Sequence, residues 1–209
     1  MNTSLVRAIF VSVITASLAS GCALLSKADS DAMRFFTLGV AIGRPGAPPD
    51  VAPGGRGEAA GLRLGSVTGA LHLEERLVFR NSAYELGYYR ELRWTERPEV
   101  CMERLLTSAL FAGGRVQHLL GGAGPILDVQ LLALDEILVP QHLARAQVIA
   151  RLHDHHRVLW EETVTVDRPV ASRLDGDLPL AAVEALDEAL QAVVDQVADR
   201  VIRELAERR

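Results

Sequence analysis

Lysine is almost absent from this chain, and its scarcity excludes two kinds of chemistry. The sequence has one lysine, Lys27, although Lys and Arg together number 22. A nucleotide-binding P-loop ends its glycine-rich turn with Lys followed by Ser or Thr, and no such run occurs here. A lysine buried in a folded domain for Schiff-base chemistry is also lacking. The chain is therefore not expected to be an ATPase.

A surplus of positive charge is missing as well. The formal net charge is −5 at pH 7, and the arginines are interspersed with acids instead of forming a stripe. Binding to a phosphate backbone needs such a stripe, so no nucleic-acid partner is expected. Aromatic residues make up only 5% of the chain, which is little for a surface that stacks sugars or bases. The apolar fraction of 49% and charged fraction of 23% are typical of a globular protein.

The N-terminal apolar run is too short to cross a membrane. It extends from Ala8 to Leu18, follows one positive residue, Arg7, and leads into small residues. A bilayer-spanning helix needs roughly 20 apolar residues. A positive start, a short apolar centre and small residues at a cleavage site are typical of a secretory signal peptide. We therefore predict a signal peptide of the lipoprotein type over residues 1–21.

Cysteine is equally scarce, with only Cys22 and Cys101. The stretch Ala19–Cys22 resembles the bacterial lipobox, in which the cysteine receives a diacylglycerol and becomes the acylated N-terminus of the mature chain. Two alternatives are an uncleaved anchor helix extending through Leu25 and a disulfide between the two cysteines. A cysteine on a flexible leash holds no fixed disulfide geometry. Cys22 is thus the predicted lipidation site, and its several acyl chains, of palmitate type, would hold the protein permanently on a membrane.

The rest of the chain divides into a tether and one domain. Residues 22–33 are short and polar, which is typical of a flexible leash that could stretch to about 35 Å. Residues 34–209 are predicted to form a single periplasmic domain. Within it, residues 43–61 contain four prolines and six glycines, so we expect a loop there.

Hydrophobic periodicity in the domain predicts strands, then a helix, then strands and a second helix. Alternating polar and apolar residues indicate strands, and apolar residues at 3–4 spacing indicate helices. The expected strands cover residues 34–42, 62–73, 76–81, 84–94, 126–138, 143–152 and 158–166, and the expected helices begin at Pro98 and Pro179. Short connections between successive strands favour an α+β fold, with a mainly antiparallel sheet of six to seven strands and both helices packed on one face.

Two clusters of polar residues are candidates for chemical sites. His153, His155 and His156 are residue types that bind zinc, but they lie where a hairpin must turn, and neighbouring side chains on a strand point apart. They are weak candidates for a metal site. Glu96, Glu99 and Glu103 lie near the start of the first expected helix, where acids favour the helix dipole.

Cys101 has no histidine within a dozen residues that could activate it, so we expect a packing residue. No catalytic residue, cofactor site or firm metal site is predicted, and the chain is not expected to be an enzyme.

One stretch of the domain resembles a known family. Residues 84–110 read YELGYYRELRWTERPEVCMERLLTSAL, and their most distinctive part combines Arg93, Trp94, Glu96 and Pro98. With the lipobox before it and the alternating hairpin at residues 143–170 after it, this stretch resembles the ABC-type transport auxiliary lipoproteins, which are PqiC-like. We expect Trp94 to lie on a buried strand face with Tyr88 and Leu92, although a solvent-facing Trp94 would be a docking anchor.

The resemblance implies a non-catalytic partner of an envelope transporter. In such systems an MCE-domain protein, a permease and an ATPase move lipids between the inner and outer membranes. This chain would be anchored through Cys22 to the periplasmic face of the outer membrane and would dock to the MCE-domain protein, with self-association as a homo-oligomer left open. The alternatives are a metal-dependent periplasmic enzyme that uses the cluster from His153 to His156, and a structural lipoprotein of an unrelated envelope complex.

Overall fold

A computed structural model describes residues 32–40, 59–172 and 176–208. The chain divides into two units, Met1–Ala32 and Met33–Arg209, and the second is described below. The predicted signal peptide, Cys22 and nearly all of the tether lie outside the described residues, as does the predicted loop from residue 43 as far as residue 58. The predicted loop, residues 43–61, ends too late, because a strand begins at Ala60.

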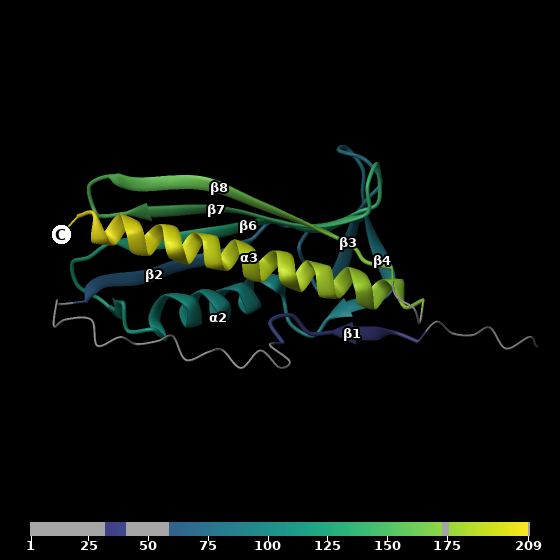
Figure 1. Cartoon of the computed structure of the whole chain (residues 1–209), viewed down its shortest axis with the longest axis horizontal. Coiled ribbons are helices and arrows are strands. Elements are labelled where there is room, and N and C mark those ends of the chain that lie inside the picture. The colour runs from purple at the N-terminus through teal and green to yellow at the C-terminus, as the bar shows by residue number, and fades with distance from the viewer. Residues whose placement is uncertain (1–31, 41–58, 173–175, 209) are drawn as a thin grey trace, which may run out of the picture. The chain divides into compact units, whose positions relative to one another are not determined.

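The described unit is built on one sheet of eight strands, covered by two helices (Figure 1). The strands are β1 (Arg34–Phe36), β2 (Ala60–Gly69), β3 (Arg76–Arg80), β4 (Leu86–Trp94), β5 (Val116–His118), β6 (Ile126–Ile137), β7 (Leu143–His153) and β8 (Val158–Pro169). The helices are α2 (Pro98–Phe111) and α3 (Leu178–Ala206).

The sheet forks along one edge of β6. The opposite edge of β6 pairs with β7 from end to end, and β7 pairs with β8, both antiparallel. On the forked edge, the first half of β6 pairs with β2 and its last residues, Asp135 to Ile137, pair with β3. Strand β2 continues to β5, whereas β3 continues to β4 and then β1. The fork therefore creates two branches that share β6.

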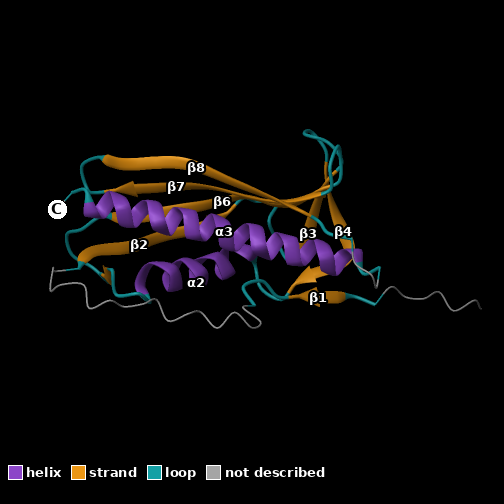
Figure 2. Cartoon of the chain, in the orientation of Figure 1, coloured by secondary structure: helices purple, strands orange, loops and turns teal. Residues whose placement is uncertain are grey.

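Both helices lie on the same face of the sheet (Figure 2). Helix α3 crosses β6, β7 and β8, and α2 lies beside it over β2 and β5. The strand face beneath α3 is lined by small residues of β7, with Ala144, Ala146 and Ala150 all fully buried. Small side chains let the helix approach closely, and its apolar stripe, from Val183 to Leu205, covers them.

A polar clasp joins β1 to the start of α3. The guanidinium of Arg34 donates two hydrogen bonds to the carboxylate of Asp177, at 3.0 and 2.7 Å. The same carboxylate caps the helix by accepting from the backbone N–H of Leu180 at 3.1 Å. Farther along α3, Asp187 accepts the backbone N–H of Gly39 at 2.5 Å, where the positive φ of 67° suits glycine. The N-terminal strand is thereby fixed to the first half of the long helix.

The predicted fold class is confirmed. The fold is α+β, the two helices pack on one face, and the longest ladders are antiparallel. The sheet has eight described strands instead of six to seven, because no pattern in the sequence predicts the three-residue β5. Four of its shorter pairings are parallel, whereas the short β3–β4 pairing is antiparallel. The first expected strand, residues 34–42, ends at Phe36, because the chain turns at Leu38 and Gly39 toward α3.

Candidate functional site

Two turns from different parts of the chain lie side by side at the end of the branch formed by β3, β4 and β1. We call residues 81–85, between β3 and β4, and residues 138–142, between β6 and β7, the paired turns. Their bases are joined by pairing of Arg80 with Ile137 and by a hydrogen bond from the Leu138 N–H to the Arg80 carbonyl at 3.0 Å. Figure 1 shows both turns projecting together above β3. They present apolar groups to solvent, since Tyr84 is 100% exposed and Val139 is 58% exposed.

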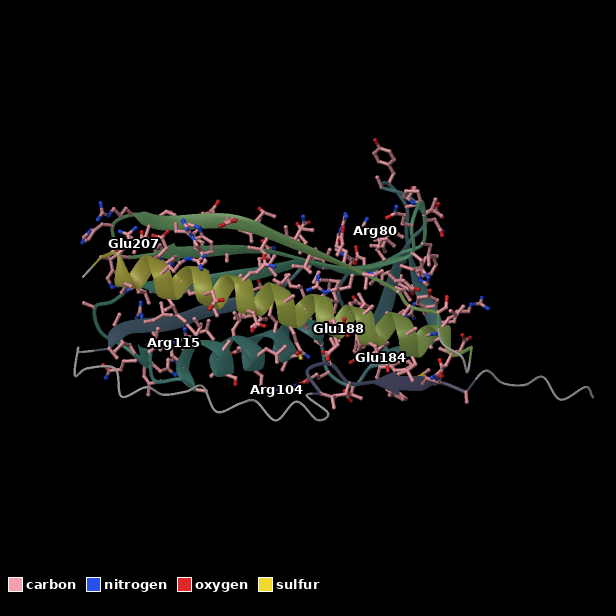
Figure 3. All side chains as sticks on the ribbon, in the orientation of Figure 1. Arg80, Arg104, Arg115, Glu184, Glu188 and Glu207 are labelled. Atoms are coloured by element: carbon pink, nitrogen blue, oxygen red, sulfur yellow. The ribbon has the colours of Figure 1, made fainter. Side chains whose placement is uncertain are left out.

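Beneath the paired turns, β6 carries a fully buried carboxylate. The Asp135 side chain is 0% exposed, and the Nε of Arg80 donates to its Oδ2 at 2.5 Å. The Nε2 of His72 lies 3.7 Å from Oδ1, close enough for an ion pair when the imidazole is protonated. Because Arg80 is the last residue of β3, this contact fixes the base of the first turn (Arg80 is labelled in Figure 3).

The next residue, Glu136, fixes the second turn from the other face of β6. Its carboxylate is also buried, and it accepts a hydrogen bond from the Tyr89 hydroxyl at 2.7 Å. Its other oxygen lies 2.5 Å from Nε2 of His142, the last residue of that turn. Burial, followed by the bond to Glu136, raises the pKa of Tyr89 above its ordinary value, so the hydroxyl remains a donor.

This acid pair ties the bases of both paired turns to β6. We call Asp135 and Glu136 with Arg80, Tyr89 and His142 the acid junction. A buried carboxylate must keep its partners, because an unpaired charge in the interior costs several kcal/mol. Glu136 uses both of its carboxylate oxygens, whereas Oδ1 of Asp135 accepts no hydrogen bond from the described residues. The contacts that the two acids do make lie at the bases of the two turns, so the junction positions the turns above it. The sequence analysis names none of these five residues as a candidate site residue. The signal that could have indicated them is the pair of adjacent acids inside an apolar strand, because acids are rarely buried.

The family-like residues form the corner between β4 and α2. Trp94 is 3% exposed, as expected, and its backbone N–H donates to the Glu75 carbonyl at 2.6 Å. Glu96 pairs with Arg104 of α2 at 2.7 Å, and Pro98 is the buried first residue of that helix. Proline suits this position because its missing N–H would have no partner within the helix. The corner therefore holds β4 and α2 together.

Two details of β4 differ from the predicted alternation. Leu92 is buried beside Trp94, but Tyr88 is exposed, so these three residues do not share one buried face. The register between β3 and β4 shifts between the pairs Arg76–Arg93 and Val78–Tyr88, which places extra residues in β4. A bulge of this kind turns a strand's side chains to the other face. Tyr89 consequently packs on Phe79, with ring centroids 4.9 Å apart.

Arg93 braces the bulge from within β4. One guanidinium nitrogen donates to the carbonyl oxygens of Tyr89 and Leu92, at 3.1 and 3.0 Å. Arg93 also lines a surface pocket of about 430 Å³, which is bounded by Glu74, Glu75, Arg76, Arg93 and Arg97. Charged groups surround this pocket, whereas pockets for hydrophobic ligands are lined mainly by apolar side chains.

The three candidate histidines do not converge. His153 is the last residue of β7, and its Nε2 lies 2.9 Å from the Oδ2 of Asp128. His155 and His156 are exposed in the turn that follows. The Asp154 carboxylate closes this turn by accepting the backbone N–H groups of His156 and Arg157 at 2.8 and 3.0 Å. Within the described residues, no group of three His, Cys, Asp or Glu side chains is arranged to hold a metal ion.

The other candidates have structural surroundings. Cys101 is a free thiol that is 0% exposed, and burial raises its pKa to about 11 despite nearby Arg104. Glu99 forms an ion pair with Arg97 at 2.9 Å in the first turn of α2. Glu103 is exposed on the same helix. Neither described helix is long and apolar enough to span a membrane.

Comparison with known proteins identifies the fold. No protein-family model and no curated protein sequence matches the chain. A crystal structure of a Xanthomonas campestris protein of family DUF330 is similar, with a TM-score of 0.65 and 18% identity, covering 83% of this chain and 98% of that one. An uncharacterised protein has a TM-score of 0.56 and 11% identity, over 69% of this chain and 99% of its own. A minor lipoprotein from Acinetobacter baumannii is more distant, with a TM-score of 0.37 and 16% identity, over 71% and 94% of the two chains. At these identities, the first two similarities establish the fold alone.

Proposed function

We propose that this chain is the membrane-anchored auxiliary lipoprotein of an MCE-type ABC system that moves lipids between the inner and outer membranes. It is anchored through Cys22 at the periplasmic face of the outer membrane and acts by docking rather than by catalysis. The observation that carries the proposal is the corner formed by Arg93, Trp94, Glu96 and Pro98. These are the residues that carry the family resemblance, and they join β4 to α2 within a fold shared with the DUF330 protein.

The paired turns are the docking surface in this proposal. Binding hot spots favour Tyr, Trp and Arg, and Tyr84 is fully exposed at the tip of the first turn. The Ser82 hydroxyl accepts the backbone N–H groups of Tyr84 and Glu85 at 3.2 and 3.1 Å, which orders that turn. A surface that is already ordered loses less conformational entropy on binding. The acid junction below therefore favours docking to a protein partner by fixing both turns in advance.

Site-specific crosslinking in whole cells tests this function. A photo-crosslinking residue would replace Tyr84 or Val139, and a matched control would replace Thr165, which is exposed on β8. We expect the MCE-domain protein to be captured from the first two positions and not from the third. Capture of a different envelope protein would favour a structural lipoprotein of another complex. If none of the positions captures an MCE-domain protein, the proposed function is wrong.

The anchor is tested separately. Replacing Cys22 by serine removes the acylated side chain, so we expect the protein to leave the membrane fraction and appear in the soluble periplasmic fraction or as an uncleaved precursor. Metabolic labelling with a palmitate analogue should mark the wild-type chain and not the C22S variant. Equal labelling of both chains would contradict acylation at this residue.

A further inference from the structure

The pocket of about 430 Å³ lies where the connection between β2 and β3 meets the end of β4. We call it the corner pocket. Its volume is within the range of small-molecule sites, but those sites are lined mainly by apolar side chains. This pocket is instead lined by charged side chains of both signs, namely Glu74, Glu75, Arg76, Arg93 and Arg97.

The acids and the arginines of the corner pocket do not pair with each other. No hydrogen bond or ion pair joins Glu74 or Glu75 to a guanidinium group that lines the same pocket; the printed contacts of Arg93 and Arg97 go to other groups. Charges that neutralised each other would offer little to a ligand. Here charges of both signs stay available to one.

The three arginines are oriented from outside the pocket. One nitrogen of Arg93 donates to two main-chain carbonyls of β4, at 3.1 and 3.0 Å. The Nε of Arg97 pairs with Glu99 at 2.9 Å, and the guanidinium of Arg76 lies over the ring of Tyr88, 5.9 Å from its centroid. A guanidinium has five N–H donors, so these contacts leave donors for a ligand. Groups that are already oriented lose less conformational entropy on binding.

The bend that carries Glu74 and Glu75 is fixed on both sides. Leu73, just before it, is 1% exposed, and its N–H donates to the Ala70 carbonyl at 2.8 Å. The Glu75 carbonyl accepts the N–H of Trp94 at 2.6 Å. An ordered segment therefore presents both carboxylates.

The mixture of charges selects the kind of ligand. A purely anionic ligand is attracted by the arginines and repelled by Glu74 and Glu75, and a purely cationic ligand meets the reverse. Only a ligand that carries both charges gains from both sets of side chains, and each repulsion then acts against the wrong ligands. Guanidinium groups match the oxygens of phosphate, whereas an ammonium group donates to carboxylates.

An exposed aromatic ring flanks the corner pocket. Phe35 of β1 is paired with Arg93 of β4, so the two side chains project from the same face of the sheet. The Phe35 residue is 61% exposed. Its ring gives the apolar part of an amphiphile a place to lie while the charged part occupies the pocket.

We propose that the corner pocket binds a zwitterionic phosphoethanolamine group, with the phosphate on Arg76 and Arg93 and the ammonium on Glu74 and Glu75. Both a phospholipid headgroup and a soluble phosphodiester carry this group. The choice of a lipid as its source rests on the proposed function, and it names the lipid chemistry that the proposed function leaves open.

Calorimetric titration of the purified full chain, in micelles of an uncharged sugar-headed detergent, tests the pocket. The ligands are glycerophosphoethanolamine, glycerophosphoglycerol, which has a hydroxyl group in place of the amine, and glycine. We expect glycerophosphoethanolamine to bind most tightly, by about fivefold over glycerophosphoglycerol, which is the upper range for one exposed charge pair.

Two variants assign the roles of the two charges. E74Q/E75Q keeps the size of the side chains and removes the acids, so the preference for the amine-bearing ligand should disappear. R76M should weaken both phosphodiesters about equally, by up to roughly fivefold. The matched controls E188Q and R157M remove one exposed charge of each sign outside the pocket and should leave both affinities unchanged. Far-UV circular dichroism checks that each variant is folded.

The source of the ligand is tested in whole cells. A photo-crosslinking residue replaces Phe35, and the matched control replaces Thr165, which is exposed on β8. Intact-protein mass spectrometry should find an adduct with the mass of a phosphatidylethanolamine at position 35 and not at position 165. If neither position carries a lipid adduct, the lipid source is wrong and the ligand is the soluble phosphodiester.

The inference itself is overturned by any of three results. These are binding of glycerophosphoglycerol or glycine as tight as that of glycerophosphoethanolamine, an unchanged preference in E74Q/E75Q, and an equal loss of binding in the control variants. The proposed function fails separately, because it depends on crosslinking of the paired turns to the MCE-domain protein. A chain that crosslinks there but does not bind glycerophosphoethanolamine overturns only the corner pocket, and the converse result overturns only the docking function.

Discussion

Removing the positive partner of Asp135 is the sharpest test of the acid junction. In the variant R80M the aliphatic stem is kept but the guanidinium is lost. The Asp135 carboxylate, which is 0% exposed, then keeps His72 at 3.7 Å and the longer-range attraction of Arg145 on β7, and neither donates a hydrogen bond to it. Breaking a buried ion pair from one side costs about 3–5 kcal/mol of the free energy of unfolding. We expect a loss of about 3 kcal/mol, the lower end of that range, because the Arg80 side chain is 26% exposed and water already screens part of the pair.

The companion variant R80M/D135L separates charge from shape. It removes both charges together, and apolar replacements of buried ion pairs are often neutral or stabilising. We therefore expect it to recover most of the loss and to unfold within about 1 kcal/mol of the wild type. The control R145M breaks the exposed Arg145–Asp167 pair and should cost less than about 1 kcal/mol.

Urea unfolding, followed by far-UV circular dichroism, gives the free energy of each variant from its midpoint and slope. The slope should be unchanged, because the surface exposed on unfolding is nearly the same. The reasoning is refuted if R80M costs less than about 1 kcal/mol, or if the double variant is no more stable than R80M.

Three further predictions follow from the corner, the thiol and the hairpin. W94A should lower the free energy of unfolding by about 3–5 kcal/mol, measured by the same method, because it empties a site only 3% exposed; a loss below about 1 kcal/mol would contradict the buried corner. Cys101 should resist a thiol reagent at pH 8 in the folded protein and react in urea, because burial raises its pKa to about 11; rapid labelling of the native chain would refute this. The hydrogen bond from Arg145 lowers the pKa of Asp167, so the folded state favours the ionised form. D167N should therefore destabilise the protein slightly above about pH 4 and lose that effect as the pH falls through the lowered pKa, as unfolding at several pH values would show.

The regular part of the fold could be predicted because its signal is local. Strict alternation of apolar and polar residues from Ala144 to Leu152 indicates a strand with one buried face. The stripe of apolar residues from Val183 to Leu205 indicates a helix that packs on a sheet. Both patterns are strong because the whole element is long. The three-residue strand β5 has no such pattern, since its pairing depends on where β2 lies in space.

The acid junction could not be predicted for a different reason. Asp135 and Glu136 interrupt the apolar run of β6 and suggest a solvated strand end. They are buried because β3 joins the sheet at this point, a parallel pairing between segments more than fifty residues apart. The bulge in β4 was missed likewise, because alternation continues through Leu92 and Trp94 in the sequence while the register shifts in the sheet.

The clasp between β1 and α3 has a mechanical consequence. If the chain is anchored through Cys22 as proposed, tension on the anchor acts first at β1, which has only three paired residues, and then at the contacts of Arg34 and Gly39 with α3. If these contacts yield before the long β6–β7–β8 ladders, the segment of residues 33–40 becomes extra slack of roughly 27 Å. The clasp would then act as a tension-limiting release, which lengthens the reach of the domain while its core remains folded.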